Sequence, residues 1–313
     1  MVNAREIPDS DDLWARVAWS TTATPGDRIV WQAIETWGAT RSLREMWAGR
    51  DPARIRHLAR ALDISPREVL GFRDRYPTPP QGSHVAEVRD RTRQLGVSLL
   101  SPGGVDWPER LLDLGPHQPV VMFARGGVDV FSSSPTLGVV GSRSPSSEGR
   151  QLCRQFSTEA IAYGYTLISG GARGIDAEAH DTADRLGGPQ VMVLATALDR
   201  LGSWQPEMVE RVARRGAIVT ETPPGQKITP ASFLHRNRVI AALSDRVVVV
   251  EAAERSGSLN TASHAKTLGR DLSAVISRPL DDTNAGCYRL VEEWGADRYD
   301  GRSMSRSARH VTW

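Results

Sequence analysis

The chain is poor in cysteine and has no long apolar run. Its 313 residues include two cysteines, Cys153 and Cys287, which lie far apart and form no Cys-x-x-Cys pair. This argues against a disulfide framework and a cysteine-rich metal site, and it favours the reducing cytoplasm. No run of about 18 apolar residues is present, so no transmembrane helix and no membrane association are expected. The acidic segment 1–12 lacks the apolar core of a secretory signal.

A strong net charge is missing as well. The 39 basic and 37 acidic residues leave a net charge of +2. Any binding of a polyanion must therefore come from local clusters of basic residues. Most of the basic residues are arginines, which suit bidentate contacts to phosphate, although a GC-rich genome also produces arginine-rich chains.

Several motifs of common enzyme classes do not occur. The chain has no Gly-x-Gly-x-x-Gly and no Walker A motif, so a standard dinucleotide or P-loop site is not expected. It also has no His-Glu-x-x-His and no Gly-x-Ser-x-Gly motif. We therefore expect no metal and no cofactor, and we assign no catalytic residue.

Hydrophobic periodicity divides the chain into two parts. Between residue 11 and about residue 75, apolar residues recur at helical spacing, as at Ile55, Leu58 and Leu62. This predicts a small helical domain over residues 1–76. Such bundles can bind DNA, but they are more often partner or packing modules. Clustered prolines and glycine predict a linker over residues 77–84.

Residues 85–300 alternate between helices and apolar strands. A helix is predicted over 85–95 and further helices over 147–163, 175–186, 206–215, 233–243 and 259–268. Strands are predicted over 97–100, 120–124, 137–140, 166–169, 190–195, 217–220, 246–251 and 272–276. This pattern indicates an extended Rossmann-like α/β fold, with a mainly parallel sheet and helices on both faces. The polar stretch that starts at Asp297 predicts a flexible tail, with residues 301–313 outside the domain.

Ligands of an open parallel sheet bind at the carboxyl ends of its strands, so the strand-to-helix loops are the places to seek a site. In the first loop, Gly141 allows close approach of the backbone, Ser142 offers a hydroxyl, and Arg143 can contact a phosphate. The following helix offers free N–H groups. These features together predict an anion site. The alternative is a serine-rich turn that caps the helix.

The second loop is rich in glycine and also precedes a helix. Ser169, Gly170, Gly171, Arg173 and Gly174 have the composition of a phosphate cradle.

Asp176 and His180 follow that loop and are four residues apart, which places them on one face of a helix. They could act as an acid/base pair. A structural role is favoured, in which Asp176 caps the helix and His180 forms a hydrogen bond nearby.

The third loop combines an aromatic residue with basic residues at a helix start. Phe233 is a candidate platform for base stacking, while Arg236, Asn237 and Arg238 are candidate phosphate contacts. The alternative is that Phe233 belongs to the core and one of the arginines forms a buried salt bridge.

The fourth loop contains Ser256, Gly257 and Ser258 ahead of another helix, in the manner of an anion loop. Glu251, at the end of the preceding strand, could pair with an arginine or act as a catalytic carboxylate. One phosphate loop would suggest a nucleotide, whereas four along one sheet edge suggest a longer polyanion. A dinucleotide could also fill them.

These motifs together resemble the signature of the DprA/Smf family of bacterial DNA-processing proteins in order and spacing. The matching segments run from about Val97 to Ala296, and the N-terminal helices resemble the sterile-alpha-motif-like domain of that family. The segments are Gly141-Ser-Arg143, Ser169-Gly-Gly-Ala-Arg-Gly-Ile-Asp176 with Ala179-His180, Phe233 with Arg236-Asn-Arg238, and Glu251 with Ser256-Gly-Ser258. Several linked motifs are far more specific than any one loop.

The resemblance implies a homodimeric protein that binds single-stranded DNA and delivers it to a RecA-type recombinase in natural transformation or related recombination. It implies a DNA pocket lined by Arg143, Ser169, Gly170, Arg173 and Phe233, and a binding factor that is not an enzyme. In the family a proline usually follows the phenylalanine, and here Leu234 takes its place. A basic residue often lies just upstream of it, whereas the nearest one here is Lys227. These departures bear on base stacking and on the recombinase surface more than on the fold.

Two other functions are compatible with parts of the pattern. A nucleotide hydrolase of a related Rossmann group would use Glu251 near the phosphate loops, but the Pro-Gly-Gly-x-Gly-Thr motif of that group is absent. A sensor or adaptor would bind a small nucleotide and signal to a partner through the helical domain.

Overall fold

The computed structural model describes residues 11–131, 135–203, 206–276 and 279–299. Its N-terminal part is helical, as predicted. The helices are α1 (Asp11–Thr22), α2 (Arg28–Trp37), α3 (Ala39–Trp47), α4 (Pro52–Ala61), α5 (Pro66–Arg75) and α6 (Gly82–Gln94). Because α6 begins at Gly82, the predicted linker is shorter than expected and its last three residues belong to the helix. The predicted tail, residues 301–313, lies outside the described residues.

Local signals explain where several of these helices begin. The Asp27 carboxylate accepts a hydrogen bond from the N–H of Ile29, and the Asp51 carboxylate caps α4 in the same way. Ser65 and Glu68 form a capping box at the start of α5, so two backbone donors are satisfied at once.

The described residues form a nine-stranded sheet of order β1-β2-β6-β5-β4-β3-β7-β8-β9. The β1–β2 and β2–β6 pairs are antiparallel, and the other neighbours pair parallel. The strands are β1 (Ser98–Leu100), β2 (Met122–Gly126), β3 (Thr136–Gly141), β4 (Thr166–Ser169), β5 (Gln190–Leu194), β6 (Gly216–Thr220), β7 (Arg246–Val250), β8 (Asp271–Val275) and β9 (Asp297–Tyr299). This confirms the predicted Rossmann-like α/β fold. The prediction that residues 272–276 form the last strand was wrong, because Asp297–Tyr299 adds one more at the edge.

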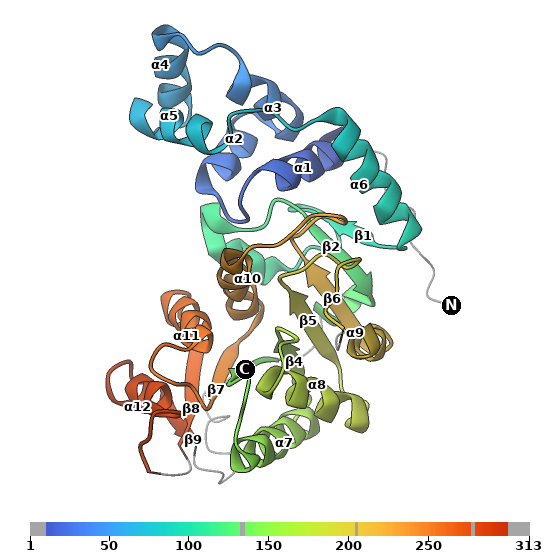
Figure 1. The fold of residues 1–313 in the computed structure, drawn as a ribbon, viewed down its shortest axis with the longest axis vertical. Helices are drawn as coiled ribbons and strands as arrows, with labels where there is room; N and C mark the ends of the chain where they lie inside the picture. The colour runs from blue at the N-terminus through green and yellow to red at the C-terminus, as the bar shows by residue number, and fades with distance from the viewer. Residues whose placement is uncertain (1–10, 132–134, 204–205, 277–278, 300–313) are drawn as a thin grey trace.

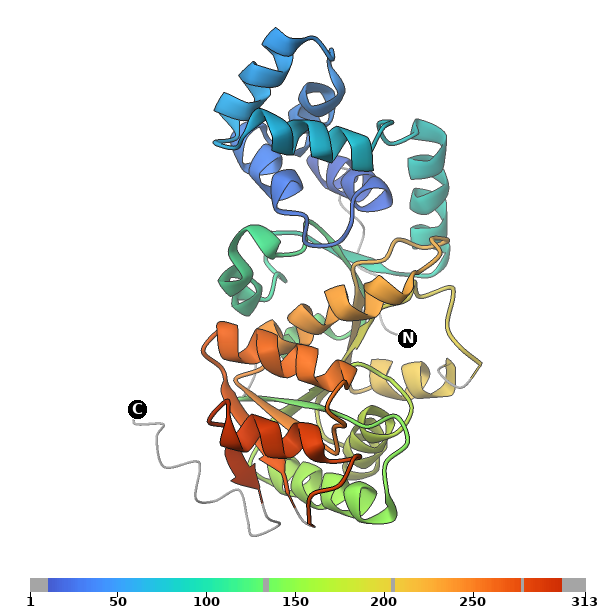
Figure 2. The ribbon, with the colours of Figure 1, turned by 60° about the vertical axis from the view of Figure 1, so that its left-hand side comes forward.

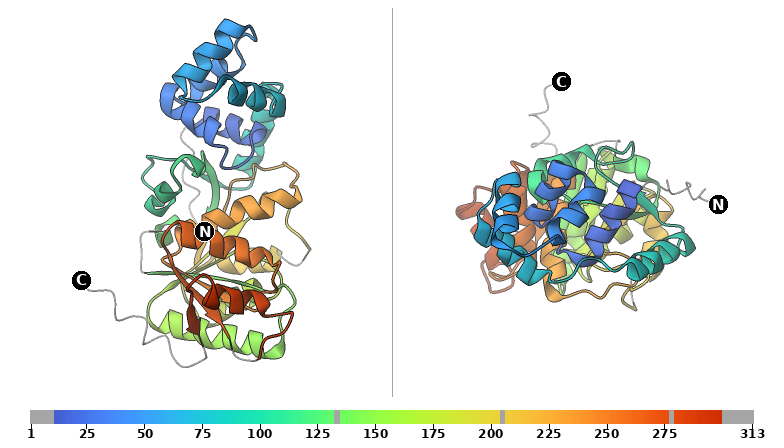
Figure 3. Two further views of the ribbon diagram at one scale, coloured as in Figure 1. Left: turned by 90° about the vertical axis from the view of Figure 1, so that its left-hand side faces the viewer. Right: turned by 90° about the horizontal axis from the view of Figure 1, so that it is seen from above.

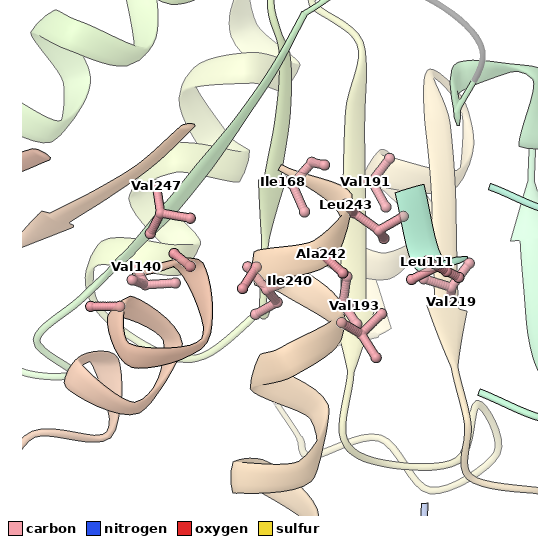
Figure 4. Close-up of a cluster of buried hydrophobic side chains, with 14 of the residues drawn as sticks. Leu111, Val140, Ile168, Val191, Val193, Val219, Ile240, Ala242, Leu243 and Val247 are labelled. Atoms are coloured by element: carbon pink, nitrogen blue, oxygen red, sulfur yellow. The ribbon is translucent and has the colours of Figure 1, made fainter. Parts of the chain in front are cut away.

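Helices cover both faces of the sheet (Figures 1 and 2). They are α7 (Ser147–Ala162), α8 (Ile175–Leu186), α9 (Pro206–Ala213), α10 (Pro230–Leu243), α11 (Gly257–Thr267) and α12 (Ala285–Glu292), with 3-10 helices η1 (Glu109–His117) and η2 (Val128–Phe131). Strand alternation sets the faces: Val247 and Val249 pack toward α10, whereas Val248 and Val250 pack toward α7 and α8. Figure 4 shows the first of these cores, with Ile240 and Leu243 of α10 against the strands.

The helical part sits at one end of the long axis, and β8, β9 and α12 lie toward the other (Figures 1 and 3). The two parts share a core, because Leu13, Trp14 and Val17 of α1 cluster with Val88 of α6 and Met192 of β5. No helix in the described ranges is long and apolar enough to cross a bilayer. The division into residues 1–76 and 85–300 stays a prediction.

Candidate functional site

The strand order places a crevice between β3 and β7. The chain passes from β3 to β4, β5 and β6 on one side, and it returns to the other side of β3 as β7. Ligands of open α/β sheets bind at such a reversal point. A pocket of about 160 Å³ lies there. Its lining comes from the loops after β3, β4 and β7 and from the starts of α10 and α11: Val140, Gly141, Arg143, Ala172, Asp176, Phe233, Leu234, Arg236, Asn237, Ile240, Ser256, Gly257, Ser258 and Thr261.

An arginine and an aromatic ring meet in this pocket. The Cζ atom of Arg143 lies 5.4 Å from the centroid of the Phe233 ring, a cation–π distance. Arg143 is exposed, and no residue in the described parts of the chain forms a hydrogen bond or ion pair with its guanidinium. The half-buried Phe233 ring can stack on a planar base, and the exposed Arg143 guanidinium can contact the neighbouring phosphate.

Gly141 is needed for packing inside the protein, and it also lines the pocket. A Cβ at this position would overlap the carbonyl oxygen of Val250, because β3 and β7 run side by side here. Ser142 lies outside the pocket lining. Its carbonyl accepts a hydrogen bond from Ile175 N at 3.1 Å, which ties the β3–α7 loop to α8.

The start of α7 already holds a carboxylate of the protein. The Ser146 N–H donates to Glu251 Oε2 at 2.7 Å, and the Ser146 hydroxyl donates to Oε1. The same hydroxyl accepts from Gly149 N at 3.0 Å, so Ser146 caps the helix. A negative charge at a helix N-terminus is favourable. The predicted free N–H groups of α7 are therefore partly used, and Glu251 joins the loops after β3 and β7 with its own backbone at a left-handed φ of 51°.

The glycine-rich loop folds around Asp176. One Asp176 oxygen accepts hydrogen bonds from Gly170 N at 3.2 Å and from Ala172 N at 3.3 Å. The N-cap of α8 is Gly174, so the prediction that Asp176 caps the helix was wrong in detail, although its role is structural. Burial raises the pKa of Asp176, and the nearby Arg236 guanidinium opposes that rise.

Five residues of this loop do not line the pocket: Ser169, Gly170, Gly171, Arg173 and Gly174. The Ser169 hydroxyl donates to Val139 O at 2.6 Å, which fixes β4 against β3. Gly171 and Gly174 have positive φ angles, which shape the turn. Arg173 is exposed on the same loop.

His180 is closed off from the pocket. It is 1 % exposed, and its Nδ1 lies 2.9 Å from the amide oxygen of Gln190, which accepts the hydrogen bond. Burial lowers the pKa of His180. Both members of the Asp176/His180 pair thus bind groups of the protein, as the structural alternative expects.

Two consecutive residues of α10, Arg236 and Asn237, hold the walls of the pocket together. Arg236 donates to Gly170 O at 2.6 Å and to Val193 O, and burial lowers its pKa to about 10, so it stays charged at neutral pH. The Asn237 amide donates to Gly257 O at 3.2 Å, at the start of α11.

Arg238 forms the buried salt bridge that the sequence left as an alternative. Its guanidinium contacts both carboxylate oxygens of Glu221 at 2.7 Å and also donates to His117 O at 2.8 Å. The prediction that Arg238 serves as a phosphate contact was therefore wrong, because all three nitrogens of its guanidinium donate to protein oxygens. A phosphate contact by Arg236 stays a prediction, although its Nε and Nη1 also donate to protein oxygens. Asn237 and Arg236 still line the pocket.

The fourth loop contributes Ser256, Gly257 and Ser258 to the pocket lining. Ser256 caps α11 by accepting from Ser258 N at 3.3 Å, and the two hydroxyls lie 2.7 Å apart.

Sequence reasoning missed Glu221. It follows the carboxyl end of β6, and the same kind of position drew attention to Glu251 after β7. In the described ranges, no group of three or more metal-ligating side chains is arranged around an ion site.

The thiols play no part in this pocket. Burial raises the pKa of Cys153 to about 12 and that of Cys287 to about 11, so neither is a reactive thiolate at neutral pH.

The chain is similar to known proteins over most of its length. The model of the family described as DNA recombination-mediator protein A matches residues 98–305. The Smf protein of Synechocystis is 36% identical over 203 residues, which are 64% of this chain and 51% of that protein. The DNA processing protein DprA of Bacillus subtilis is 31% identical over 211 residues, or 66% of this chain and 71% of that protein. This chain thus spans about half the length of the Synechocystis relative.

A solved structure shares the fold over nearly the whole chain. DprA from Streptococcus pneumoniae matches 96% of this chain and 98% of its own, with a TM-score of 0.74 and 24% identity. DNA processing protein A from Helicobacter pylori, described for its single-stranded DNA binding mode, matches 64% of this chain and 90% of its own, with a TM-score of 0.58 and 24% identity.

Proposed function

Because this chain belongs to the DNA recombination-mediator protein A family, we propose that it binds single-stranded DNA in the pocket between β3 and β7. The observation that carries the proposal is the exposed Arg143 guanidinium over the Phe233 ring. A phosphate would contact Arg143, and the adjoining base would stack against Phe233. The Helicobacter pylori relative is described as binding single-stranded DNA, which supports the same ligand.

In this proposal, the residues that touch DNA differ from the residues that hold them in position. Arg143, Phe233 and the Ser256-Gly257-Ser258 loop would touch the strand, and the exposed Arg173 would extend the track. Behind them, Arg236 and Asp176 fix the glycine-rich loop, and Asn237 fixes α11.

The bound strand would then be passed to a RecA-type recombinase by a homodimer of this chain in the cytoplasm. In this proposal the protein is a binding factor and not an enzyme. The engagement of Asp176, His180 and Glu251 with protein groups supports that view, since these are the titratable residues that first suggested acid/base chemistry.

Fluorescence anisotropy of a labelled thymidine oligonucleotide and a matching duplex tests DNA binding. We expect a preference for the single strand and a slope of log K against log salt of about −0.7 per phosphate contact. Phe233→Ala should weaken binding by roughly 1–3 kcal/mol for each base stacked on the ring. Arg143→Ala should also reduce the slope, because one phosphate contact is lost.

Arg214→Ala is the matched control. Arg214 is an exposed arginine beyond the end of α9 and outside the pocket lining, so its removal should leave both the affinity and the slope unchanged. Equal binding of duplex and single strand, or an Arg143→Ala variant that behaves like Arg214→Ala, would contradict the site.

Delivery of the strand has its own experiment. With single strands precoated by a single-strand-binding protein, this chain should shorten the lag before a RecA-type recombinase hydrolyses ATP. Arg143→Ala should leave the lag as long as it is without the chain. An unchanged lag with the unaltered protein would remove the recombinase from the proposal while leaving DNA binding in place.

A further inference from the structure

A second and larger pocket lies in the helical part of the molecule, away from β3 and β7. Its volume is about 780 Å³, against about 160 Å³ for the pocket at the sheet edge. It is a groove formed by α1, α3, the segment 79–82 and α6, the helices at the upper end of Figure 1. Ligand pockets in proteins span roughly 300–1,000 Å³, so this groove is large enough for several side chains.

The floor and walls of the groove are apolar and held in place by the fold. Trp14 lies at its base with 5 % exposure. Trp47 packs against Trp19, with ring centroids 5.1 Å apart, and its indole N–H donates to Tyr76 O at 3.0 Å. Pro79 and Pro80 add a wall whose φ angles are fixed by their rings. A groove with these walls is formed before any ligand arrives, which lowers the entropic cost of binding.

The charged side chains that line the groove are both arginines. The described lining includes Arg44 on α3 and Arg89 on α6, and it includes no acidic residue. The Arg89 guanidinium lies 4.5 Å from the Trp14 ring centroid, which places positive charge directly on the apolar floor. Arg44 is exposed, and no acidic side chain of the described residues pairs with it.

Glu45, which follows Arg44 in the sequence, is already paired with other arginines. Glu45 contacts Arg54 and lies 3.1 Å from Arg41, and these two arginines lower the pKa of its carboxyl. The groove therefore presents the positive charge of Arg44 at the edge of an apolar surface. The complementary ligand is a segment with carboxylates and at least one large apolar side chain.

A protein segment fits this groove better than a nucleic acid. A strand of DNA needs a row of phosphate contacts, and the lining offers two arginines. Stacking needs an open aromatic face, whereas Trp14 is buried under Arg89 and Trp47 is packed on Trp19 and Phe72. We propose that this groove is a docking site for a short acidic segment of a partner protein, with a carboxylate on Arg44 and an apolar side chain against Leu43 and Val85 of the lining.

Selection from a phage-displayed library of random peptides on the full chain tests this proposal. We expect the recovered peptides to combine Asp or Glu with a large apolar residue. As synthetic labelled peptides, they should bind Arg44→Ala about tenfold more weakly, since a charge-assisted contact is lost. Ala86→Trp, which fills the groove from an exposed position on α6, should abolish binding.

Two variants on the same helices serve as controls. Arg41→Ala removes an exposed arginine of α3 that pairs with Glu45, and Gln94→Trp adds a ring to α6 outside the lining. Both should bind the peptides as the unaltered chain does. All four variants should keep their affinity for the thymidine oligonucleotide, which shows that they are folded.

Three results would overturn the proposal. The first is a library that yields no peptide sensitive to Arg44→Ala and Ala86→Trp. The second is a loss of oligonucleotide affinity in Arg44→Ala as large as in Arg143→Ala, which would make the groove a DNA contact. The third is a change of sedimentation coefficient in Ala86→Trp, which would assign the groove to a second copy of this chain.

Discussion

His180 illustrates how a buried side chain in this protein links stability to pH. Its ring is shielded in α8 and bonded to Gln190, and burial lowers its pKa below the ordinary value of 6.5. The imidazole of His180 therefore binds a proton near pH 6.5 in the unfolded chain, but only at lower pH in the folded chain. Stability from the neutral ring is present above pH 6.5 and is lost as the pH falls toward the folded pKa.

We expect the free energy of unfolding to fall between pH 7.5 and pH 5.5. The slope should approach about 1.4 kcal/mol per pH unit for each such histidine. His235 and His264, whose pKa values burial also lowers, add to it. Urea unfolding of His180→Gln across this range should show a smaller slope than the unaltered chain. An identical slope in the two proteins would mean that His180 is not one of the groups responsible.

Residue identity alone could not predict the partners of the charged side chains. The run Arg236-Asn-Arg238 reads as a phosphate-binding cluster at a helix start, but Arg236 reaches Gly170 and Arg238 reaches Glu221. These partners are distant in the sequence and become neighbours only when the sheet forms. Arg143 is different, because its loop is short and its exposure follows from its place at the strand end.

At the scale of elements, the Arg238–Glu221 pair joins α10 to the segment that follows β6. The two side chains are 6 % and 10 % exposed. Arg238→Met should lower the free energy of unfolding by about 3–5 kcal/mol, because a buried carboxylate is left without its partner. The measurement is equilibrium unfolding in urea, followed by circular dichroism.

The pair Arg125–Glu210 provides the comparison, since its side chains are 38 % and 54 % exposed. Arg125→Met should cost less than about 1 kcal/mol. Arg238→Met combined with Glu221→Met should be less damaging than the sum of the two single changes. Additive losses would show that the two residues act independently.

Buried elements could be predicted from their pattern, and an edge element could not. The predicted bounds of β4 and α8 are those of the structure, because a continuous apolar run and a clear helical period mark them. The segment Asp297–Tyr299 has a single apolar residue and was expected to be a tail. It forms β9 because β8 offers a free edge and because the Tyr299 ring packs on Phe156 at 5.7 Å.

On the scale of the whole molecule, the helical part touches the helix that bears Phe233. Gly26, in the loop between α1 and α2, has a φ of 77°, and a Cβ there would lie 2.7 Å from Arg238 Nε. Its carbonyl oxygen accepts from His117 Nδ1 at 3.0 Å. A change in this loop should therefore be transmitted to the pocket through Arg238 and α10.

We expect Gly26→Ala to lower the melting temperature and also to weaken binding of the thymidine oligonucleotide by about fivefold, close to 1 kcal/mol. Gly38→Ala is the control. Its φ of 74° imposes a similar strain, but no atom lies within 4 Å of the added Cβ. It should lower the melting temperature and leave the affinity unchanged. Equal loss of affinity in the two variants would show that strain, and not contact with Arg238, is responsible.

The overall architecture could be predicted, while the meeting of the two parts could not. Alternating strands and helices were sufficient for the Rossmann-like sheet, and helical spacing was sufficient for the N-terminal bundle. The shared core of α1, α6 and β5 depends on how the parts dock, and no local pattern encodes that. The apolar groove beside it escaped prediction for the same reason, since its walls come from separate helices.

The start of α10 also has a consequence for how such a sequence can change over generations. Successive residues of a helix point about 100° apart, so Arg236, Asn237 and Arg238 each reach a different partner while Phe233, one turn earlier, faces Arg143. A substitution removes one of these links. An inserted or deleted residue between Phe233 and Arg236 would turn the ring away from its guanidinium by 100° with every other link intact. Substitutions in this stretch should therefore be tolerated far more readily during evolution than insertions or deletions.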